Sequence, residues 1–355
     1  MSEKTGRDPR RLPRPTINDV AALAGTSKAT VSFVMNGRQN VATTTRERVL
    51  SAADALAWTP NHRARSLSTS RAYALGLVFA RSPETLGSNS FFAPFIAGLE
   101  STLAESDQSL LLRFVADPAA EEDAYRKLRA QGRVDGVVLT DIRHQDSRID
   151  LLERIGLPAV TLNPVDIPSP FPAVVLDEEQ GMTEAVEYLT GLGHERIAYV
   201  GGPEIYLHST LRRLTWRRAL DLHGLSPSRS IETDFSASDG ARATSEVLGL
   251  PREQRPTAIV YANDSMAIAG LVAARHLGLR VPEDLSVVGF EDSELSAHVN
   301  PPLTTVRSDS FGWGRVAAEV LLQFLQPGEH TAERTLPPAQ LVIRDSAARC
   351  HGGGG

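Results

Sequence analysis

The sequence has one cysteine, Cys350, and no apolar run that is long enough to cross a membrane. A single cysteine excludes an intramolecular disulfide framework and a cysteine-based zinc cluster, and it favours a reducing cytoplasm. The longest apolar runs, such as Ala74–Ala80 and Ala258–Ala262, are far shorter than the roughly 18 to 20 residues that span a bilayer. Charged residues near the N-terminus replace the apolar stretch of a signal peptide. We therefore expect neither secretion nor membrane insertion.

The motifs of common enzyme classes are also missing. The chain contains no Gly-x-Ser-x-Gly elbow, no His-Glu-x-x-His, no phosphate-binding Gly-x-x-x-x-Gly-Lys-Ser/Thr loop and no Gly-x-Gly-x-x-Gly fingerprint. Its nine histidines are scattered, and His194, in a Gly-His turn before a predicted strand, is interpreted as structural. We expect no catalytic site, metal or cofactor, and an enzyme acting on sugars is the least supported class.

The charges that are present are unevenly distributed. The whole chain has a net charge of −6, but residues 1–71 hold twelve Lys/Arg against five Asp/Glu. A small basic segment therefore precedes a large acidic body. Basic segments of this kind are typical of phosphate contact, although a solvated basic tail gives the same composition. With 355 residues and 41% hydrophobic composition, the chain is long enough for two or three globular units.

Three short helices are predicted in the first 60 residues. Thr16 and Asp19 form a variant of the capping box at the start of the first helix. A second helix is predicted from a cap at Ser27 to the Asn36-Gly37 stop, and a third over about residues 44–56. Two short helices joined by a Gly-containing turn are typical of the helix-turn-helix, whose second helix enters the DNA major groove.

The segment Thr16-Ile-Asn-Asp-Val-Ala-Ala-Leu-Ala-Gly-Thr-Ser-Lys-Ala-Thr-Val-Ser-Phe-Val-Met-Asn-Gly37 resembles the DNA-binding head of the lactose repressor (LacI/GalR) family of bacterial transcription regulators. The resemblance continues through Thr44–Val49 and into Trp58–Leu67, which is similar to the hinge helix of that family. It then covers the body to about residue 346. By this resemblance we expect double-stranded operator DNA and a second copy of the chain as partners.

The resemblance also implies which residues contact DNA. Lys28, Ala29 and Phe33 are expected to face base edges in the major groove. Contacts that are mainly to phosphates are expected from Ser27, Thr30, Ser32 and Asn36, and Thr16 completes the predicted contacts in the head. Many family members have Arg at the position of Phe33, and Phe offers only apolar contact, for example to a thymine methyl group. Alternatively, Phe33 packs between the head and the hinge.

The expected hinge helix follows the head. Asn61 is a suitable helix cap, and Arg63 adds positive charge to a segment that is too short to hold a helix alone in water. By resemblance, Leu67 is an apolar wedge that enters the minor groove and kinks the operator, and Ala64 lets two hinge helices approach closely. Alternatively, Leu67 is a linker residue that packs on the body.

The body alternates predicted strands with segments of helical length. Apolar runs that are typical of buried parallel strands occur at Ala74–Ala80, Leu110–Ala116, Gly136–Thr140, Ala159–Asn163, Val174–Asp177, Arg196–Gly201, Ala258–Ala262 and Leu285–Phe290. Helices are predicted at Phe92–Ala104, Glu178–Leu192, Leu211–His223, Asp264–Leu277 and Gly312–Leu325. This order predicts two doubly wound α/β sheets, with a ligand cleft outside the carboxyl ends of the strands.

The resemblance implies a two-lobed body similar to that of periplasmic sugar-binding proteins. Crossings between the lobes are expected near Asn163, Phe290 and Leu325. The N-lobe then comprises about 73–162 and 291–324, and the C-lobe about 163–290 and 325–346. The full expected division is a disordered basic tail at 1–15, the helix-turn-helix domain at 16–60, the hinge and linker at 61–72, the body at 73–346 and a flexible tail at 347–355.

Seven residues match positions that hold ligands in the family: Phe91, Phe92, Arg212, Phe235, Asn263, Asp264 and Glu291. Several have structural alternatives. Phe92 and Phe235 are also interpreted as core aromatics, Arg212 as a surface salt-bridge partner and Asp264 as a helix cap. The family usually has Asp at the position of Glu291, so either the ligand is smaller than usual or Asp292 contributes.

An aromatic platform with a few carboxylates and one Arg suits a sugar or a nucleoside-like effector, and the resemblance favours a sugar. The sequence thus predicts a ligand-responsive transcription regulator of the repressor type, in which a homodimer reads a near-palindromic operator. The alternative is a carbohydrate-binding receptor for which the basic head is incidental.

Overall fold

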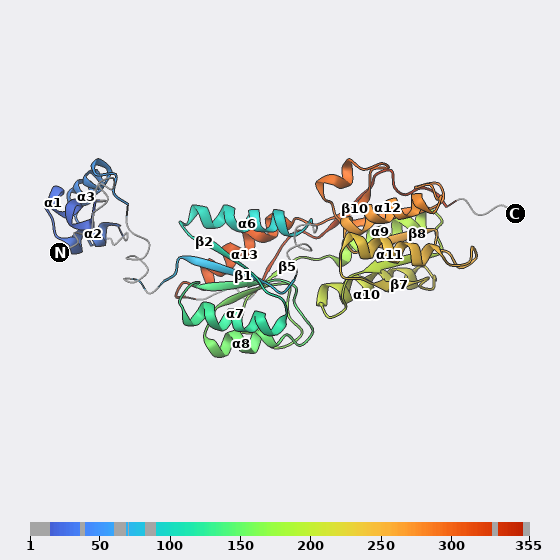
Figure 1. The fold of residues 1–355 in the computed structure, drawn as a ribbon, viewed down its shortest axis with the longest axis horizontal. Coiled ribbons are helices and arrows are strands. Elements are labelled where there is room, and N and C mark those ends of the chain that lie inside the picture. Colours follow the sequence, from blue (N-terminus) through green and yellow to red (C-terminus); the bar gives the residue numbers. More distant parts are fainter. Residues whose placement is uncertain are drawn as a thin grey trace, which may run out of the picture. The chain divides into compact units, whose positions relative to one another are not determined.

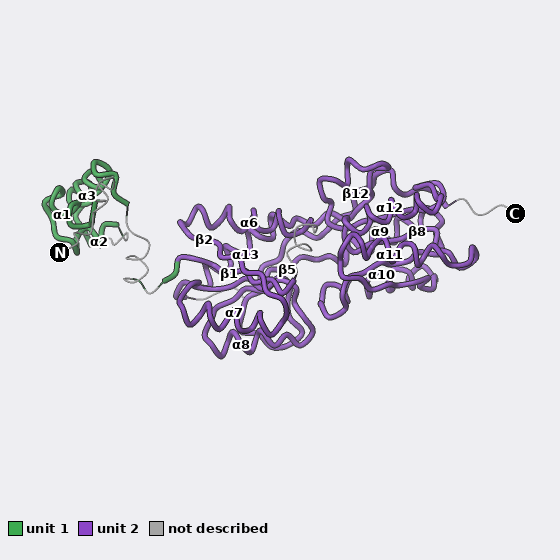
Figure 2. Tube along the Cα trace, viewed as in Figure 1, with its two compact units in different colours: residues 1–72 green, residues 73–355 purple. Residues whose placement is uncertain are grey.

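The computed structural model describes residues 15–35, 40–59, 69, 71–81, 90–328 and 333–350. The chain divides into two compact units, Met1–Ala72 and Tyr73–Gly355, which Figure 2 shows in different colours. We call them the head and the body. Each contains buried apolar side chains of its own, so each has a separate hydrophobic core.

The head consists of the three predicted helices, α1 (Ile17–Leu23), α2 (Lys28–Met35) and α3 (Thr43–Ala55). The Asp19 carboxylate accepts both the backbone N–H and the hydroxyl of Thr16, each at 2.7 Å, at the start of α1. The Ser27 hydroxyl accepts the backbone N–H of Thr30 at 3.1 Å and so caps α2. The core between the helices is formed by Val20, Ala21, Ala24, Val31, Val34, Val49, Ala52 and Ala53.

The body contains two six-stranded sheets, which define the two lobes (Figure 1). The N-lobe sheet has the order β11-β5-β4-β3-β1-β2 and is parallel throughout. Its strands are β1 (Ala74–Phe79), β2 (Ser109–Phe114), β3 (Gly136–Leu139), β4 (Ala159–Leu162), β5 (Ala173–Val175) and β11 (Glu333–Thr335). Its helices are α6 (Phe92–Glu105), α7 (Pro118–Ala130), α8 (Ser147–Ile155) and α13 (Ser310–Phe324).

The C-lobe sheet has the order β12-β10-β9-β8-β6-β7, and only its β10–β12 pair is antiparallel. Its strands are β6 (Ile197–Gly201), β7 (Ser230–Glu232), β8 (Ala258–Tyr261), β9 (Ser286–Glu291), β10 (Thr304–Arg307) and β12 (Gln340–Val342). Its helices are α9 (Glu179–Gly191), α10 (Leu207–Leu222), α11 (Ala237–Leu248), α12 (Asp264–His276) and the 3-10 helix η1 (Glu294–Ala297).

All eight strands that the sequence predicts are present, but one differs in burial. β2 lies at the edge of the N-lobe sheet, and its side chains Leu112 and Phe114 are 39% and 46% exposed. The strands that were not predicted are β7, β10, β11 and β12, which have three or four residues each. Each of them contains polar or charged residues (Ser-Ile-Glu, Thr-Thr-Val-Arg, Glu-Arg-Thr and Gln-Leu-Val), so none has the apolar run by which a buried strand is identified.

The predicted crossings between the lobes are wrong by one strand each. β5 pairs with β4 in the N-lobe sheet, β10 pairs with β9 in the C-lobe sheet, and β11 pairs with β5 in the N-lobe sheet. The chain therefore crosses after β5, after β10 and between β11 and β12, rather than near Asn163, Phe290 and Leu325. A polar turn at the cleft end of a parallel strand has the same sequence pattern whether the chain returns to its sheet or crosses over.

The predicted flexible tail starts too early. Ala347 is buried, the Ala348 backbone N–H donates to the Ser286 hydroxyl at 3.1 Å, and the Cys350 N–H donates to the Leu192 carbonyl at 2.9 Å. His194 lies between this segment and the lobe, with its ring nitrogens 3.0 Å from the Ala348 carbonyl and 2.9 Å from the Thr257 hydroxyl. Its predicted structural role is confirmed. Residues 351–355 lie outside the described residues, as do residues 1–14 of the tail that was expected at 1–15.

Within the part of the chain that the structure describes, no helix is both long enough and apolar enough to pass through a membrane.

Candidate functional site

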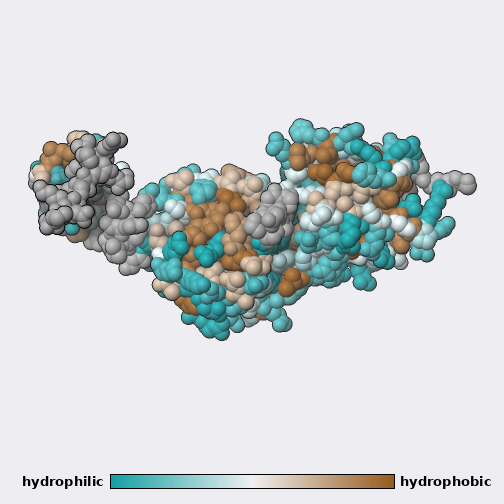
Figure 3. All heavy atoms as spheres, viewed as in Figure 1, coloured by the Kyte–Doolittle hydropathy of each residue, from teal (hydrophilic) through white to brown (hydrophobic). Residues whose placement is uncertain are grey.

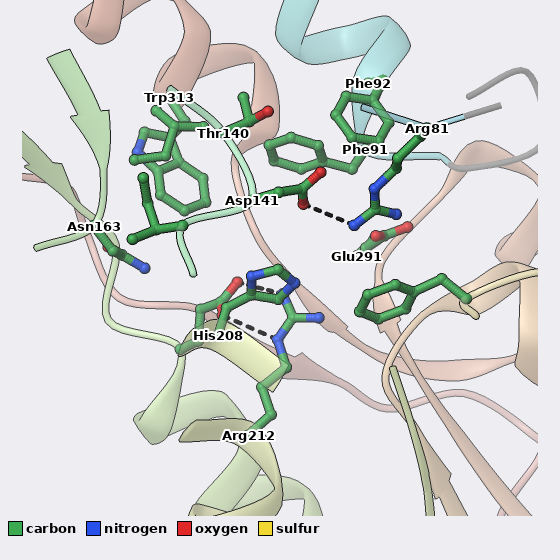
Figure 4. A pocket seen from close by; sticks show the side chains of 14 residues that line it. Arg81, Phe91, Phe92, Thr140, Asp141, Asn163, His208, Arg212, Glu291 and Trp313 are labelled. Carbon is green, nitrogen blue, oxygen red and sulfur yellow. Dashed lines mark hydrogen bonds and ion pairs between the residues drawn. The ribbon is translucent and has the colours of Figure 1, made fainter. Parts of the chain in front are cut away.

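A pocket lies where strands of both sheets end (Figure 4), and its empty volume is about 550 Å³ when the open solvent at its mouth is included. Arg81, Asp141 and Asn163 follow the carboxyl ends of β1, β3 and β4 in the N-lobe. Glu291 ends β9 in the C-lobe, and Arg212 reaches the pocket from α10. This is the position at which doubly wound sheets bind ligands.

Five of the seven residues predicted to bind ligand line this pocket: Phe91, Phe92, Arg212, Phe235 and Glu291. Phe92 is only 3% exposed and packs edge-on against Phe79, with ring centroids 5.0 Å apart. The core interpretation therefore holds for most of its ring. Phe91 is half-buried and meets Trp313 edge-on at 5.9 Å, so these two rings form the aromatic wall of the N-lobe.

Asn263 and Asp264 do not line the pocket, and their prediction is corrected. The Asn263 amide caps α12 by accepting the Met266 N–H at 2.8 Å, and it donates to the Phe235 carbonyl at 3.0 Å. The Asp264 carboxylate is fully buried, where it accepts the Thr305 hydroxyl at 2.5 Å and the Ser293 N–H at 2.6 Å. Burial raises the pKa of Asp264 to about 6. Both side chains therefore hold neighbouring segments in place without lining the pocket.

Arg212 is held in a buried ion pair. Its Nε lies 2.9 Å from one carboxylate oxygen of Glu178, and its Nη2 lies 2.5 Å from the other. The remaining nitrogen, Nη1, donates to the Ala262 carbonyl at 2.8 Å, and the guanidinium lies over the Phe290 ring at 4.0 Å. The surface salt-bridge alternative is wrong, because Arg212 is 8% exposed and Glu178 only 2%.

A second arginine, Arg81, reaches the pocket from the N-lobe and was not predicted. It donates to Asp141 at 2.8 Å, and its guanidinium lies over the rings of Tyr206 at 5.0 Å and Phe235 at 5.2 Å. Phe235 packs against Gly202, where a Cβ atom would lie 1.9 Å from the ring. Only glycine leaves room for this ring, which closes the C-lobe side of the pocket.

Glu291 joins the two lobes at the pocket, because an oxygen of its carboxyl group accepts the hydroxyl of Ser90 from the N-lobe. Burial raises the pKa of Glu291 to about 8, so this side chain carries a proton at neutral pH. Asp292 does not take its place. Its oxygens bind Arg344 at 2.6 Å and Arg307 at 2.7 Å, outside the pocket lining.

His208 on α10 completes the ligand-facing surface. Its ring stacks between Tyr206 and Phe235, with centroid distances of 5.6 Å and 5.7 Å. Burial, together with the nearby Arg212 charge, lowers the pKa of His208 to about 4, so the imidazole is neutral. The pocket thus combines two compensated arginines, a protonated carboxyl group and a neutral imidazole.

The sequence contained a signal for only some of the missed residues. Arg81, Asp141 and Asn163 each follow the end of a predicted strand, so the strand-end rule identifies them once all strands are placed. Glu178 and His208 reach the pocket by tertiary packing that no local pattern indicates. Among the described residues, no group of three or more His, Cys, Asp or Glu side chains is placed to hold a metal ion.

In the head, α2 presents a row of predicted DNA contacts. Ser27, Lys28 and Ala29 are exposed, and Phe33 is 42% exposed and is not part of the core of the head. Thr16 is exposed at the start of α1. Thr30 and Ser32 are half-buried. The predicted contacts Asn36, Asn61, Arg63, Ala64 and Leu67 lie outside the described residues.

Curated proteins match nearly the whole chain, and family models match two parts of it. A model for bacterial regulatory proteins of the lacI family matches residues 16–61, and one for a periplasmic binding protein-like domain matches residues 186–347. The probable transcriptional repressor ExuR of Bacillus subtilis is 32% identical over 94% of this chain and 98% of that protein. The repressor PurR of Aliivibrio fischeri is 31% identical over 94% of this chain and 98% of that protein.

Solved structures show the same fold. A lac repressor dimer bound to operator and the anti-inducer ONPF superposes with a TM-score of 0.80 at 31% identity, covering 94% of this chain and 99% of that chain. The complex of the regulator CelR with cellobiose has a TM-score of 0.72 at 30% identity, covering 94% of this chain and 100% of that chain. The chain therefore belongs to the lacI family of bacterial regulatory proteins and is a DNA-binding transcription regulator rather than an enzyme.

Proposed function

We propose that this regulator binds a near-palindromic operator as a homodimer and responds to a neutral, hydroxyl-rich effector in the pocket between its lobes. The pairing of both pocket arginines carries the effector part of this proposal. Ligand binding would favour one arrangement of the lobes and so change operator affinity, by a coupling free energy on the order of 1 to 3 kcal/mol.

The charge of the pocket favours a neutral ligand. Asp141 compensates Arg81, and Glu178 compensates Arg212, so neither guanidinium offers an uncompensated positive charge to a carboxylate or phosphate. The protonated Glu291 can donate to a hydroxyl, and the rings of Phe91 and Trp313 suit the apolar face of a sugar. The cellobiose in the CelR complex is a neutral sugar, which supports this class.

The head supports the DNA part of the proposal. α2 places Lys28, Ala29 and Phe33 on its exposed surface, while Val31 and Val34 anchor the helix to the core. We propose that this helix enters the major groove, with Phe33 contacting a thymine methyl group and with Ser27, Thr30 and Ser32 near phosphates. Thr16 at the start of α1 is the further proposed contact in the described head.

Exposed apolar side chains support the homodimer. Leu112 and Phe114 on the edge strand β2 are 39% and 46% exposed. Figure 3 shows an apolar area on one face of the N-lobe. An exposed apolar edge strand is rarely left uncovered in a stable monomer. The solved lac repressor relative is a dimer on its operator.

A bacterial regulator that binds DNA acts where the chromosome lies. We therefore propose that this protein is located in the cytoplasm, and on the nucleoid when it is bound to DNA.

A ligand screen with the full chain tests the effector class. Thermal unfolding is followed with matched neutral sugars, their uronic acids and purine bases, and stabilising compounds are then tested for a change in operator affinity. We expect stabilisation by a neutral sugar and little from its uronate. Stabilisation by the uronate or a purine base alone would overturn the proposed class. The alternative of a carbohydrate-binding receptor without a DNA role does not fit a chain that belongs to this family of DNA-binding regulators.

A further inference from the structure

Two loops, one from each lobe, are hydrogen-bonded to each other beside the pocket. The first joins β3 to α8 in the N-lobe, and the second joins β6 to α10 in the C-lobe. The Leu207 N–H donates to the Ile142 carbonyl at 2.9 Å, and the His144 N–H donates to the Ile205 carbonyl at 3.1 Å. These bonds surround an antiparallel bridge between residues 143 and 206. The loops therefore form a short strip of β-structure that joins the lobes.

The side chain of His144 adds a further connection between the lobes. Its Nδ1 lies 3.0 Å from the carboxylate of Asp166, on the N-lobe loop between β4 and β5. Its Nε2 lies 3.1 Å from the hydroxyl of Thr210, on α10 of the C-lobe. The ring thus spans the boundary between the lobes, with a polar partner at each nitrogen.

The partners of His144 define its protonation state. The Gln145 N–H donates to Asp166 at 2.8 Å and lowers the pKa of that carboxyl group, so Asp166 is ionised at neutral pH and can only accept. The Thr210 hydroxyl has one hydrogen, which it donates to the Glu204 carbonyl at 3.1 Å, so toward His144 it can only accept. Both ring nitrogens must therefore donate, which only an imidazolium can do.

Loss of one proton is incompatible with this arrangement. A neutral imidazole has a single N–H, so at least one of three hydrogen bonds must break: His144 to Asp166, His144 to Thr210, or Thr210 to Glu204. Histidine is the side chain that ordinarily changes its charge between pH 5 and 8. The connection through His144 should therefore weaken as the pH rises through that range.

The other charged groups around His144 have partners of their own. In the N-lobe they form the pairs Asp141–Arg81, Arg143–Glu121 and Asp146–Arg148, and in the C-lobe the pairs Glu204–Arg213, Glu178–Arg212 and Glu179–Arg218. The Asp177 carboxylate accepts the Glu179 N–H at 2.9 Å. Burial lowers the pKa of His208 to about 4, so that ring stays neutral. Asp166 is thus the carboxylate that contacts the His144 ring.

We infer that His144 is a pH-sensitive latch between the lobes: as an imidazolium it ties Asp166 of the N-lobe to Thr210 of the C-lobe, and loss of its proton weakens the tie. Because the proposed function makes operator affinity depend on the arrangement of the lobes, the regulator would respond to pH as well as to its effector. That consequence rests on the proposed function, whereas the latch itself does not.

The distance between the lobes tests the latch in the full chain. Spin labels are attached at Glu153→Cys on α8 and Asp221→Cys on α10, both exposed, with Cys350→Ser to remove the native thiol. Labelled chains are mixed with a large excess of unlabelled chains, so that the distances measured lie within one chain. Every protein carries Glu291→Gln, because the pKa of Glu291 is about 8 and its titration would overlap with that of His144.

Pulsed electron paramagnetic resonance at pH 6 and pH 8 gives the ratio of separated to closed lobes. With His144 present, we expect this ratio to rise about two- to five-fold at pH 8, since a partly exposed tie is weak. His144→Ala should give the higher ratio at both pH values. His276→Ala removes an exposed histidine of α12 and should leave the pH response intact.

Thr210→Val tests the latch without removing a titratable group. It deletes the acceptor on the C-lobe side and should raise the ratio already at pH 6, whereas Thr190→Val, whose hydroxyl bonds within α9, should not. Equal ratios at pH 6 and pH 8 with His144 present, or a pH response that survives His144→Ala, would overturn the latch. Nitrogen NMR of histidine-labelled chains that shows a neutral His144 at pH 6 would overturn it too. No ligand is added, so the outcome is independent of the effector class.

Discussion

Arg212 and Glu178 form a buried, two-point ion pair at the floor of the pocket, with Nε–Oε2 and Nη2–Oε1 distances of 2.9 Å and 2.5 Å. The pair joins α10 to the segment that enters the C-lobe after β5. Because Glu178 already neutralises the guanidinium, Arg212 can contribute hydrogen-bond direction to the pocket without an uncompensated charge. On the N-lobe side, Arg81 is paired with Asp141 through a single contact of 2.8 Å.

Glu178→Gln is expected to destabilise the body. The substitution leaves the Arg212 guanidinium buried without its counterion, and breaking a buried pair in this way costs about 3 to 5 kcal/mol. Urea unfolding measures the loss. Glu179→Gln is the matched control, because its pair with Arg218 is exposed and should contribute about 1 kcal/mol or less. Equal losses for the two variants would show that the buried pair contributes no more to the free energy of unfolding than the exposed pair does.

Arg212→Lys is expected to weaken ligand binding without changing operator binding. Lysine cannot contact Glu178 and the Ala262 carbonyl with the planar geometry of arginine, so ligand affinity should fall by about ten-fold or more. Operator affinity without ligand should be unchanged, because the head keeps its own core. Fluorescence anisotropy of a labelled operator, with and without the effector, measures both quantities. An unaltered ligand response would remove Arg212 from the site.

Glu291→Gln is expected to change the pH dependence of stability. The pKa of Glu291 is raised to about 8 in the folded body, against 4.5 for the ordinary group. The folded protein therefore holds a proton that the unfolded chain releases, and stability from this group falls as the pH rises from about 4.5 to 8. Thermal unfolding at pH 6 and pH 8 should show wild type losing more stability than Glu291→Gln. Parallel losses would mean that Glu291 is ionised at neutral pH.

Phe33→Ala tests the proposed base contact of α2. Loss of an apolar contact should relax the base preference at one position in each half-site. The dependence of affinity on salt should stay the same, because Phe releases no counterions. Competition binding with single-base operator variants measures the preference. Leu23→Ala is a suitable control, since Leu23 is 57% exposed on α1 and is not a predicted contact. A preference that Phe33→Ala leaves intact would assign Phe33 a packing role.

Much of the fold follows from local patterns, and the site follows only in part. Apolar runs such as Ala258–Tyr261 are buried whichever lobe they join, so they identify strands without assigning them to a sheet. For the same reason, β5 was placed in the wrong lobe. The segments that form the unpredicted strands β10 and β11 were also placed in the wrong lobes. The seven-residue helix α1 was found from Thr16 and Asp19, because capping is a local interaction.

The site residues likewise divide into those that a sequence motif identifies and those that only tertiary packing places. Arg212 and Glu291 were predicted because they lie in motifs that resemble family pocket positions, and both line the pocket. Asp264 lies in such a motif too, but Thr305 and Ser293 bind its carboxylate behind the pocket. His208 has no local signal. Its place depends on the rings of Tyr206 and Phe235, the second of which is distant in sequence.

The central claim is that this chain reads a specific DNA sequence and that its pocket controls the reading. Selection of bound duplexes from a random pool by the full chain, followed by titration of the selected duplex with the stabilising sugar, tests both parts together. We predict recovery of one near-palindromic site, whose affinity changes about five-fold or more with the sugar. Retention that is sequence-independent and sensitive to salt, with no response to the sugar, would contradict the account.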